Sequence, residues 1–406
     1  MKILCVFGQY NYGKPERGVS YEYANFIPAL RKLDHEITFF DSWDKSLYED
    51  FSNLNRKLLH KIAEDDPDII FCVLMGYEIW LETFNLIRRG SNAAIINWAT
   101  DDSWKYDQFS RFVAPVFDAY ATTYSSAMKK AEADGHGNFL LTQWAANSAT
   151  MSEPLPATEC RYDVTFIGSA YGDRKKRIEA LKERGIEVIC FGFGWPTGPV
   201  AAEAIPRIIR SSKLCLNLAD SGLVLEGGMP TRCRQIKARG FEVPGAGGLL
   251  LTEPAEHLED YYNTEDEIIL FNDIDGLVEK INHLLANPDE RDALAGAGFL
   301  RTWLEHSYEE RFRPLLQYAV DQRHLREKAE LKINFVNFDK IAEAHHCGLL
   351  LWILRSILLF PCVLIWGKQR GAKAARRFLF ELSWRISGRR TYSVSGLPGR
   401  LFYKQS

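Results

Sequence analysis

The chain is predicted to fold as an α/β protein with two doubly wound lobes and a helical C-terminal tail. Three observations lead to this prediction. The 406 residues are too many for one ordinary core and fit two domains of about 150 residues with a remainder. Apolar runs of strand length alternate with amphipathic runs of helix length, as in parallel sheets covered on both faces. The alternation stops at Pro154 and Pro156 and then starts again.

The first lobe begins with a strand. Residues 2–8 (KILCVFG) are mostly apolar and end in glycine, as in strands that are buried on both faces. Apolar residues then recur at helical spacing through 20–33, where Ser20 is placed to cap the first turn. The further strands are predicted at 36–40, 68–75, 93–99, 117–123 and 138–144, and the further helices at 50–64, 77–89 and 125–134.

The second lobe repeats this pattern from the strand 162–168 onward. A helix over 173–184 follows, which Asp173 is placed to cap and Gly185 to end. Ligands of doubly wound sheets bind beyond the carboxyl ends of the strands, so the predicted binding site is the cleft between the lobes. The further strands are predicted at 186–192, 213–219, 248–252 and 267–271, and the further helices at 201–211, from near Thr231, and at 273–287.

Charge is distributed unevenly over the three predicted segments, which are the domains 1–153 and 160–325 and the tail 331–406. The whole chain has a net charge of −3, but the tail holds 13 Lys and Arg against three acids. The tail therefore carries +10 and the rest of the chain −13. An acidic body argues against nucleic-acid binding, and a basic tail beside apolar residues favours an anionic membrane surface.

The eight cysteines predict a reducing environment. They form no C-x-x-C pair, and several lie in apolar runs such as IIFCVL, as reduced core thiols do. The N-terminal run MKILCVFG is too short for a secretory signal peptide. We therefore expect a cytoplasmic protein.

The tail contains a nearly continuous apolar segment, residues 347–367. Its 21 residues match the roughly 20 that span a bilayer, but Arg355 and Pro361 argue against spanning. Basic residues follow directly, beginning with Lys368, and such residues stay cytoplasmic and attract anionic lipid. We expect residues 347–386 to attach to the membrane from one side. The alternative is a helical hairpin packed against the acidic body.

The segment 235–253 (QIKARGFEVPGAGGLLLTE) is the richest in candidate binding residues. A helix is expected to end at GFE, and a glycine turn then leads into a strand. This order is the reverse of a dinucleotide fingerprint, in which the glycine loop follows a strand. Glu242 is suited to accept hydrogen bonds from sugar hydroxyls, and Lys237 and Arg239 are suited to face a diphosphate. The alternative is a solvated helix end with an ordinary glycine turn.

This segment resembles the donor-binding region of the CgeB-like glycosyltransferases, which are related to the group 1 glycosyltransferases. The likeness extends over about residues 1–325 and implies a GT-B fold, in which two Rossmann-type domains face each other across a cleft. Other stretches that resemble the family are SYEYANFIPALRKLDHEITFFD, INWATDDSWKYD, LTQWAAN, VTFIGSAYGDRKKRIEALKERGIEVICFG, IRSSKLCLNLADS and RTWLEHSYEERF, the last of which resembles a late helix of the family.

The resemblance implies that a sugar is transferred from a nucleotide-diphosphate donor, which is a substrate rather than a cofactor, and that no bound metal is needed. Glu242 would bind the donor ribose. A second glutamate, usual eight residues earlier, is replaced here by Arg234, so the contact to the donor sugar is left open. The glycine turn under the donor would contain Gly245, Gly247 and Gly248.

Two further loops are candidate parts of the site. Gly168 follows a strand and opens the loop before a helix, where exposed amides together with Arg174 or Lys175 would hold phosphate. Asp101 and Asp102 follow the fourth strand, where a carboxylate is placed to deprotonate an acceptor hydroxyl. The alternatives are a plain strand–helix turn and a helix cap, respectively.

Aromatic and histidine side chains are further candidates for the site. Trp98 and Trp104 flank the two aspartates and are candidates for stacking on a sugar. His306 is a weaker candidate for approaching the cleft, and no cluster of His, Cys and carboxylates has metal-ligand spacing.

The sequence thus predicts a glycosyltransferase that acts on a glycan or lipid-linked acceptor in surface-polysaccharide or glycolipid assembly. Two alternatives remain, a nucleotide-sugar epimerase of the same architecture and a non-catalytic assembly protein at the membrane. A Rossmann-type oxidoreductase is disfavoured because no strand–GxGxxG–helix unit occurs.

Overall fold

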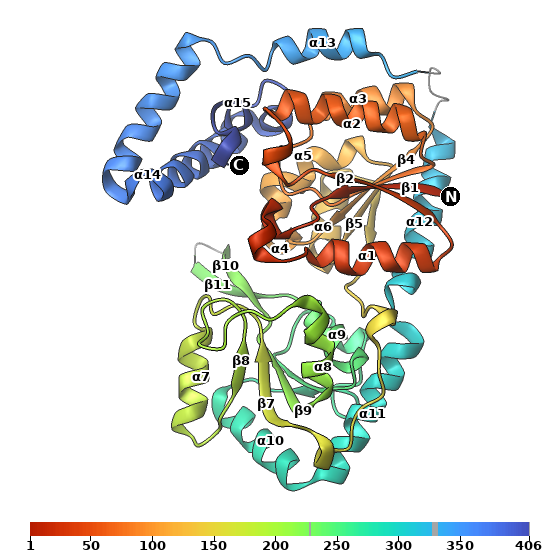
Figure 1. Cartoon of the computed structure of the whole chain (residues 1–406), viewed down its shortest axis with the longest axis vertical. Coiled ribbons are helices and arrows are strands. Elements are labelled where there is room, and N and C mark those ends of the chain that lie inside the picture. The colour runs from red at the N-terminus through yellow and green to blue at the C-terminus, as the bar shows by residue number, and fades with distance from the viewer. Residues whose placement is uncertain (227–228, 327–331, 406) are drawn as a thin grey trace.

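The computed structural model describes residues 1–226, 229–326 and 332–405, with the backbone alone over 220–226 and 229–233. The chain forms two α/β lobes, one above the other in Figure 1, and a helical tail beside the first lobe. This is the architecture predicted from the alternation of apolar runs.

The first lobe is built on a parallel sheet with the strand order β2-β1-β3-β4-β5-β6. Consecutive side chains of a strand point to opposite faces, and both faces of this sheet are buried. This explains why the strands are almost wholly apolar. The strands are β1 (Lys2–Phe7), β2 (Glu36–Asp41), β3 (Ile69–Cys72), β4 (Ala94–Ala99), β5 (Ala119–Thr122) and β6 (Phe139–Leu141).

Helices cover both faces of this sheet. α1 packs on one face, and its N-cap is Ser20, whose Oγ accepts a hydrogen bond from the Tyr23 amide, as predicted. α2 and α3 pack on the opposite face. The helices of this lobe are α1 (Tyr21–Lys32), α2 (Phe51–Asp65), α3 (Leu81–Gly90), α4 (Asp102–Lys105), a π-helix (Tyr106–Ser110), α5 (Arg111–Val113) and α6 (Ser125–Ala133).

The second lobe has a parallel sheet with the order β13-β12-β9-β7-β8. Its strands are β7 (Tyr162–Ile167), β8 (Ile189–Phe191), β9 (Ser212–Asn217), β12 (Leu249–Thr252) and β13 (Ile269–Leu270). Its helices are α7 (Arg174–Glu183), α8 (Ile205–Arg210), α9 (Arg239–Gly245), α10 (Ile274–Ala286) and α11 (Pro288–Glu305).

The region before α9 differs from the prediction. Instead of a loop followed by a helix from near Thr231, the chain forms an antiparallel hairpin of β10 (Asp220–Glu226) and β11 (Met229–Arg234). The helix begins only at Arg239 and extends past GFE to Gly245. The prediction was wrong because this hairpin lies outside the main sheet and lacks the continuous apolar run that marks the buried strands.

The chain crosses between the lobes twice, and the two crossings lie side by side. Ala146, before the second lobe, forms a parallel bridge with Ser307, after it. The predicted late helix over 301–312 is therefore divided at His306. The following α12 (Tyr308–Leu325) packs against α1 and the first sheet, although the sequence division places it in the second domain.

The tail consists of α13 (Phe335–Glu343), α14 (Leu349–Ser387) and α15 (Leu397–Leu401). Among the described residues, one helical stretch, Leu349–Tyr392, is long and apolar enough to cross a membrane by length and composition alone. Gly367 has a φ of 73° and divides α14 into two arms, 349–366 and 368–387. The tail is thus a helical hairpin.

Candidate active site

A cavity of about 320 Å³ lies between the two lobes. The first lobe contributes residues that follow β4 and begin α1, and the second lobe contributes residues at the ends of β7 and β9. The cavity therefore lies at the carboxyl edges of both sheets, where the fold predicts a ligand. It is lined by Tyr21, Thr100, Asp101, Trp144, Phe166, Ile167, Tyr171, Arg174, Asn217, Gln235, Lys237, Ala238, Arg239 and Glu242.

Asp101 lines this cavity from the first lobe. It occupies the N-cap position of α4, but its side chain makes no capping hydrogen bond. Instead, its Oδ2 lies 3.6 Å from Lys105 Nζ and accepts a hydrogen bond of 3.3 Å from Thr100 Oγ1. The alternative of a helix cap therefore does not account for this carboxylate.

Asp102 points away from the cavity into the first lobe. It is 2% exposed, and Ser110 Oγ donates a hydrogen bond to its Oδ1. Burial raises the pKa of Asp102 to about 6, while its hydrogen bonds to Ser110 and Thr122 act in the opposite direction. The sequence could not separate the two aspartates, but the structure places only Asp101 at the cavity.

Glu22 is a buried carboxylate near the cavity that the sequence analysis did not single out. It lies in the first turn of α1, next to Tyr21, and is 8% exposed. Burial raises its pKa to about 7, and Asp101 and Lys105 are its charged neighbours. An acid in the first turn of a helix is common, because it interacts favourably with the helix dipole, so its type and position gave no specific signal.

Glu242 lines the cavity from the second lobe. It lies in α9 between the buried side chains of Phe241 and Val243, which fix the helix against the lobe core. Its Oε2 forms an ion pair of 2.9 Å with Arg239 Nη1, one turn earlier. Both side chains are about one-fifth exposed, at 19% for Arg239 and 21% for Glu242. A polar ligand in the cavity can therefore reach this carboxylate.

Positive charge gathers on the same side of the cavity. Arg174 and Lys237 line it together with Arg239. Arg174 is 9% exposed, donates to the Ser169 carbonyl at 3.0 Å and lies 3.9 Å from the ring centre of Tyr171. The guanidinium thus holds the loop before α7 while it faces the cavity.

The predicted glycines do not all lie at the cavity. A Cβ on Gly245 would stand 2.6 Å from Ala146 Cβ, and one on Gly247 would stand 2.6 Å from the Ser152 carbonyl oxygen. Gly248 packs on the core side chains of Ile209 and Cys215. None of the three lines the cavity. This turn needs glycine because it packs against the interlobe linker and the core.

Gly168 lies closer to the cavity than these three glycines do. It directly follows Phe166 and Ile167, which line the cavity, and a Cβ there would stand 3.3 Å from Arg174 Nη1. Its carbonyl accepts a hydrogen bond of 2.7 Å from Trp195 Nε1. The loop therefore borders the cavity, with its backbone fixed by neighbouring side chains.

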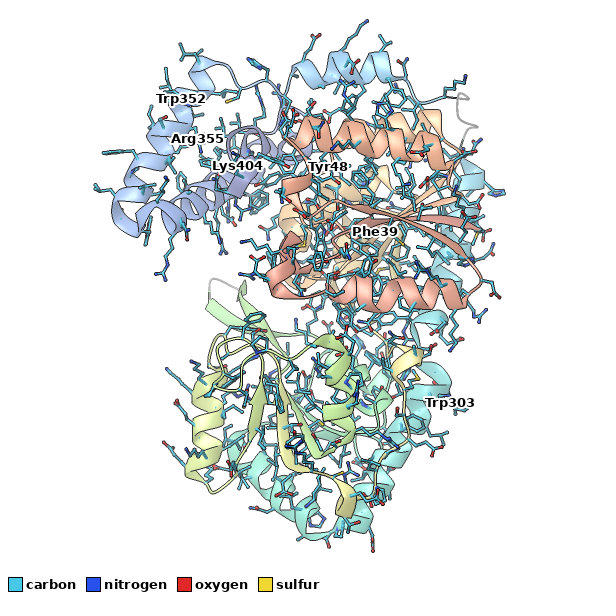
Figure 2. All side chains as sticks on the ribbon, in the orientation of Figure 1. Phe39, Tyr48, Trp303, Trp352, Arg355 and Lys404 are labelled. Atoms are coloured by element: carbon cyan, nitrogen blue, oxygen red, sulfur yellow. The ribbon has the colours of Figure 1, made fainter. Side chains whose placement is uncertain are left out.

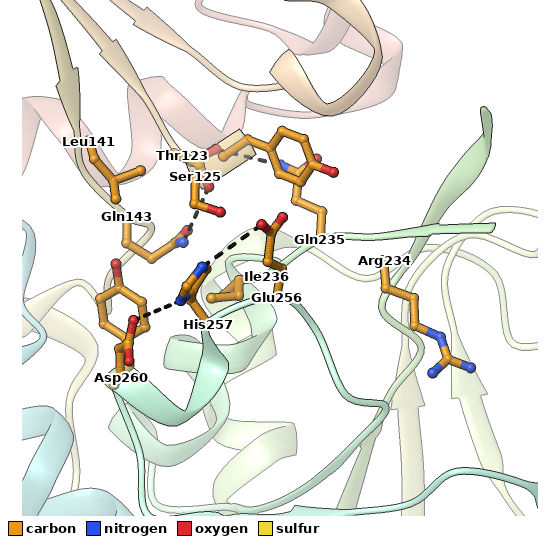
Figure 3. A pocket seen from close by; sticks show the side chains of 12 residues that line it. Thr123, Ser125, Leu141, Gln143, Arg234, Gln235, Ile236, Glu256, His257 and Asp260 are labelled. Atoms are coloured by element: carbon orange, nitrogen blue, oxygen red, sulfur yellow. Dashed lines mark hydrogen bonds and ion pairs between the residues drawn. The ribbon is translucent and has the colours of Figure 1, made fainter. Parts of the chain in front are cut away.

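Arg234 borders a second, smaller cavity between the lobes, of about 130 Å³ (Figure 3). Its Nη2 lies 3.4 Å from Glu253, a buried carboxylate that also pairs with Arg177 at 2.8 Å. Between the two cavities, buried Gln235 joins the lobes by accepting from Ser103 Oγ at 2.7 Å. Arg234 thus lines a different cavity from Glu242.

The two tryptophans predicted to stack on a sugar do not line the larger cavity. Trp98 is fully buried in the core, so its predicted stacking on a sugar is wrong. Trp104 is 45% exposed but does not line the larger cavity. Trp144 lines it instead. A tryptophan in an almost wholly apolar strand belongs to the core, which the sequence pattern could have indicated.

The structure also shows where His306 lies and whether the described residues form a metal-binding group. His306 is buried in the second lobe, where its Nε2 lies 2.7 Å from the Tyr261 carbonyl oxygen. Burial lowers the pKa of His306 to about 4. It does not line the larger cavity. Within residues 1–226, 229–326 and 332–405, no group of three or more His, Cys, Asp or Glu side chains is arranged to hold a metal ion.

Comparisons with known proteins agree with the fold. Residues 174–317 match the family model described as Glycosyl transferase-like. This match contains α9, Arg174, Lys237, Arg239 and Glu242. A search of curated proteins finds no match.

Solved structures resemble the chain over most of its length. Sucrose-phosphate synthase from Thermosynechococcus elongatus has a TM-score of 0.53 at 11% identity, covering 80% of this chain and 98% of that chain. Anabaena HepE in complex with UDP and glucose has a TM-score of 0.51 at 12% identity, covering 78% and 99%. AviGT4, a glycosyltransferase involved in avilamycin A biosynthesis, has a TM-score of 0.50 at 11% identity, covering 80% and 97%. The chain has a GT-B fold.

Proposed function

We propose that this protein is a glycosyltransferase that moves a sugar from a nucleoside-diphosphate donor to an acceptor hydroxyl. One observation carries the proposal. Within the region that matches the Glycosyl transferase-like family model, Glu242, Lys237, Arg239 and Arg174 line one cavity, and Asp101 faces them from the other lobe. A carboxylate and several cations suit a ribose and a diphosphate, and the opposite carboxylate suits a hydroxyl acceptor.

Donor binding is assigned to the second lobe. The Glu242 carboxylate accepts hydrogen bonds from the ribose hydroxyls, and binding would compete with its ion pair to Arg239. Arg174 and Lys237 face the diphosphate and stabilise the negative charge that develops on the leaving group. We expect these cations to make a bound metal unnecessary, so that activity persists in excess EDTA. Because the solved HepE complex contains UDP and glucose, a uridine nucleotide is the first donor to test.

Acceptor activation is assigned to Asp101. A general base must reach the proton that it removes, and Asp101 lies at the cavity whereas Asp102 is turned into the lobe interior. Asp102 would then support the α4 segment through Ser110 rather than act on substrate. Closure of the lobes around the donor would exclude water and limit its hydrolysis.

The proposal also covers the cellular location of the reaction, the class of acceptor and the subfamily. The basic and apolar tail supports action at the cytoplasmic face of a membrane, on a glycan or lipid-linked acceptor in surface-polysaccharide or glycolipid assembly. The resemblance of the glycine-turn segment to the CgeB-like glycosyltransferases makes that group the proposed subfamily.

Titration calorimetry with UDP and GDP tests the donor site. We expect Glu242→Ala to weaken binding of the preferred nucleotide by about 10- to 100-fold, because a hydrogen bond to a charged group contributes about 1.5–3 kcal/mol. The matched control is Glu279→Ala, an exposed glutamate of α10, which should bind as the unchanged protein does. Unchanged affinity in Glu242→Ala would contradict the assignment of this cavity.

The two alternative functions give different outcomes in a second assay. A labelled nucleotide sugar is incubated with the protein in the absence and presence of acceptor preparations. An epimerase converts the nucleotide sugar without an acceptor, whereas a transferase yields a labelled acceptor product. A non-catalytic assembly protein yields neither product, with or without Glu242.

A further inference from the structure

The first arm of the tail hairpin, residues 349–366, has one protein-facing side and one exposed side. The protein-facing side packs on a small cluster around Leu379, Leu401 and Phe402. The exposed side includes large apolar residues that recur every three or four positions and are 41–82% exposed, namely Leu350, Ile353, Ile357, Phe360 and Leu364. This spacing places them along one stripe of the helix.

The only charged residue of this arm lies on the protein-facing side. Arg355 Nε donates a hydrogen bond of 2.9 Å to the Leu401 carbonyl, and the guanidinium lies 5.6 Å from the ring centre of Phe402. Figure 2 labels Arg355 and Trp352 on this arm. The charge that argues against membrane insertion therefore lies on the protein-facing side and does not interrupt the apolar stripe.

The chain folds back on itself at the C-terminal end of this arm. The chain turns at Gly367, and a Cβ on Gly371 would stand 2.5 Å from the Cys362 carbonyl oxygen, so the two arms touch closely at the turn. The second arm then packs against α15. A spanning helix is surrounded by lipid and leaves its two ends on opposite sides of the bilayer. This arm is covered on one side by its own tail, so it fits the membrane interface rather than the membrane interior.

Positive charge lies at the turn and along the first half of the second arm. Lys368, Arg370, Lys373 and Arg377 are exposed, and within the part of the chain that the structure describes none of the four forms an ion pair. An apolar stripe next to exposed cations is the pattern of helices that lie at the surface of anionic membranes. If a second copy of this chain covered the stripe instead, the cations of the two copies would repel each other. An anionic bilayer is therefore the better match in charge.

The tail is fixed to the segment that carries the candidate catalytic aspartate. The Tyr392 hydroxyl donates to the Gln108 carbonyl, and the Tyr392 ring packs on Phe109 and Phe112 at 5.3 and 6.0 Å between ring centres. These partners belong to the π-helix and α5, which directly follow Asp101 and α4. The position of the hairpin is thereby linked to the acceptor side of the cavity.

We propose that the arm 349–366 lies in the plane of an anionic bilayer without spanning it. Its apolar stripe enters the boundary between headgroups and acyl chains, and the cations of the turn contact lipid phosphates. In this orientation the tail holds the first lobe at the membrane, beside a lipid-linked acceptor. This last consequence rests on the proposed function, whereas membrane binding itself does not.

Vesicle sedimentation with the full chain tests whether the apolar stripe of the arm 349–366 binds an anionic bilayer. We expect binding to vesicles of phosphatidylcholine with phosphatidylglycerol and at least tenfold weaker binding to phosphatidylcholine alone. The double variant Ile357→Glu with Leu364→Glu should lose at least tenfold in binding. The matched control is Leu300→Glu with Leu304→Glu, exposed residues of α11 in the other lobe, near the labelled Trp303 in Figure 2. Equal binding of both double variants, or a dimer that binds no vesicles, would overturn the proposal.

Accessibility to a membrane-impermeant maleimide separates lying on the membrane from spanning it. Native Cys347 is exposed and precedes the arm, and Gln369→Cys places a second thiol beyond it. In sealed vesicles we expect both thiols to react from the same side, and reaction from opposite sides would show a spanning helix. The glutamate variants of the arm should keep nucleotide binding and activity on a soluble acceptor, so a failure here is distinct from a failure of the proposed function.

Discussion

The two lobes share an architecture but present opposite charges to the cavity between them. Both are parallel sheets whose strands end at the cavity, yet the first lobe brings Asp101 and, behind it, Glu22. The second lobe brings Arg174, Lys237 and Arg239 around one carboxylate. The backbone alone does not distinguish the roles of the lobes. The side chains at the sheet edges do, and they are the basis for the proposed donor site on the second lobe and the proposed general base on the first.

Substitution of Asp101 is expected to have the largest effect, and it separates the acceptor role of the first lobe from the donor role of the second. Asp101→Asn should lower kcat about 10²- to 10⁴-fold, the range for loss of a general base, with the affinity for the donor nucleotide nearly unchanged. Steady-state kinetics together with nucleotide titration measures both quantities. Asp102→Asn is the neighbouring comparison and should act mainly on stability, because that side chain is buried. Equal losses of kcat in both variants would remove the distinction between the two aspartates.

A smaller effect concerns the pH dependence of stability. Burial raises the pKa of Glu22 from its ordinary value near 4.5 to about 7, so the folded protein binds more protons than the unfolded chain between these values. This carboxyl therefore lowers stability as pH rises through that window. Relative to the unchanged protein, Glu22→Gln should gain up to about 3 kcal/mol between pH 4.5 and 7, because 1.36 kcal/mol corresponds to each pKa unit.

Urea unfolding of both proteins at several pH values measures this difference. Other groups that titrate in the same window, including Asp102 and His306, are present in both proteins and largely cancel in the comparison. A stability difference that stays constant from pH 4.5 to 7 would show that Glu22 is not buried as a neutral acid.

A pair of glycines in α11 gives a third, purely structural prediction for the second lobe. A Cβ on Gly298 would stand 2.4 Å from the Glu267 carbonyl oxygen, whereas one on Gly296 meets no atom within 4 Å. Gly298→Ala should destabilise the protein by about 1–3 kcal/mol through overpacking. Gly296→Ala should stabilise it by up to about 1 kcal/mol through helix propensity. Thermal unfolding of the two variants checks the sign of each change, and two changes of the same sign would contradict the packing described.

The sequence predicted the elements of the two sheets well because their strands are buried on both faces. Strands such as β1 and β4 are nearly continuous apolar runs, and the helices between them carry clear amphipathic spacing. The β10–β11 hairpin was missed because a two-stranded element outside the main sheet needs no such run.

The candidate site was predictable in part, for a similar reason. Glu242 and Asp101 follow recognisable patterns and line the cavity. The glycines at 245, 247 and 248 were expected under the donor because glycine permits close approach, but the sequence does not say which atoms approach. Here they are the interlobe linker and the lobe core. Glu22 lies in the family-like stretch that begins at Ser20, but nothing in that stretch marks it out, and only its burial beside Asp101 and Lys105 brings it to notice.

The assignment of donor and acceptor sides is tested most directly by a crystal structure of the full chain with bound UDP. We predict that the ribose hydroxyls contact the Glu242 carboxylate and that the diphosphate lies near Arg174 and Lys237, with Asp101 across the cavity. A nucleotide bound at the first lobe, or in the smaller cavity beside Arg234, would contradict this assignment.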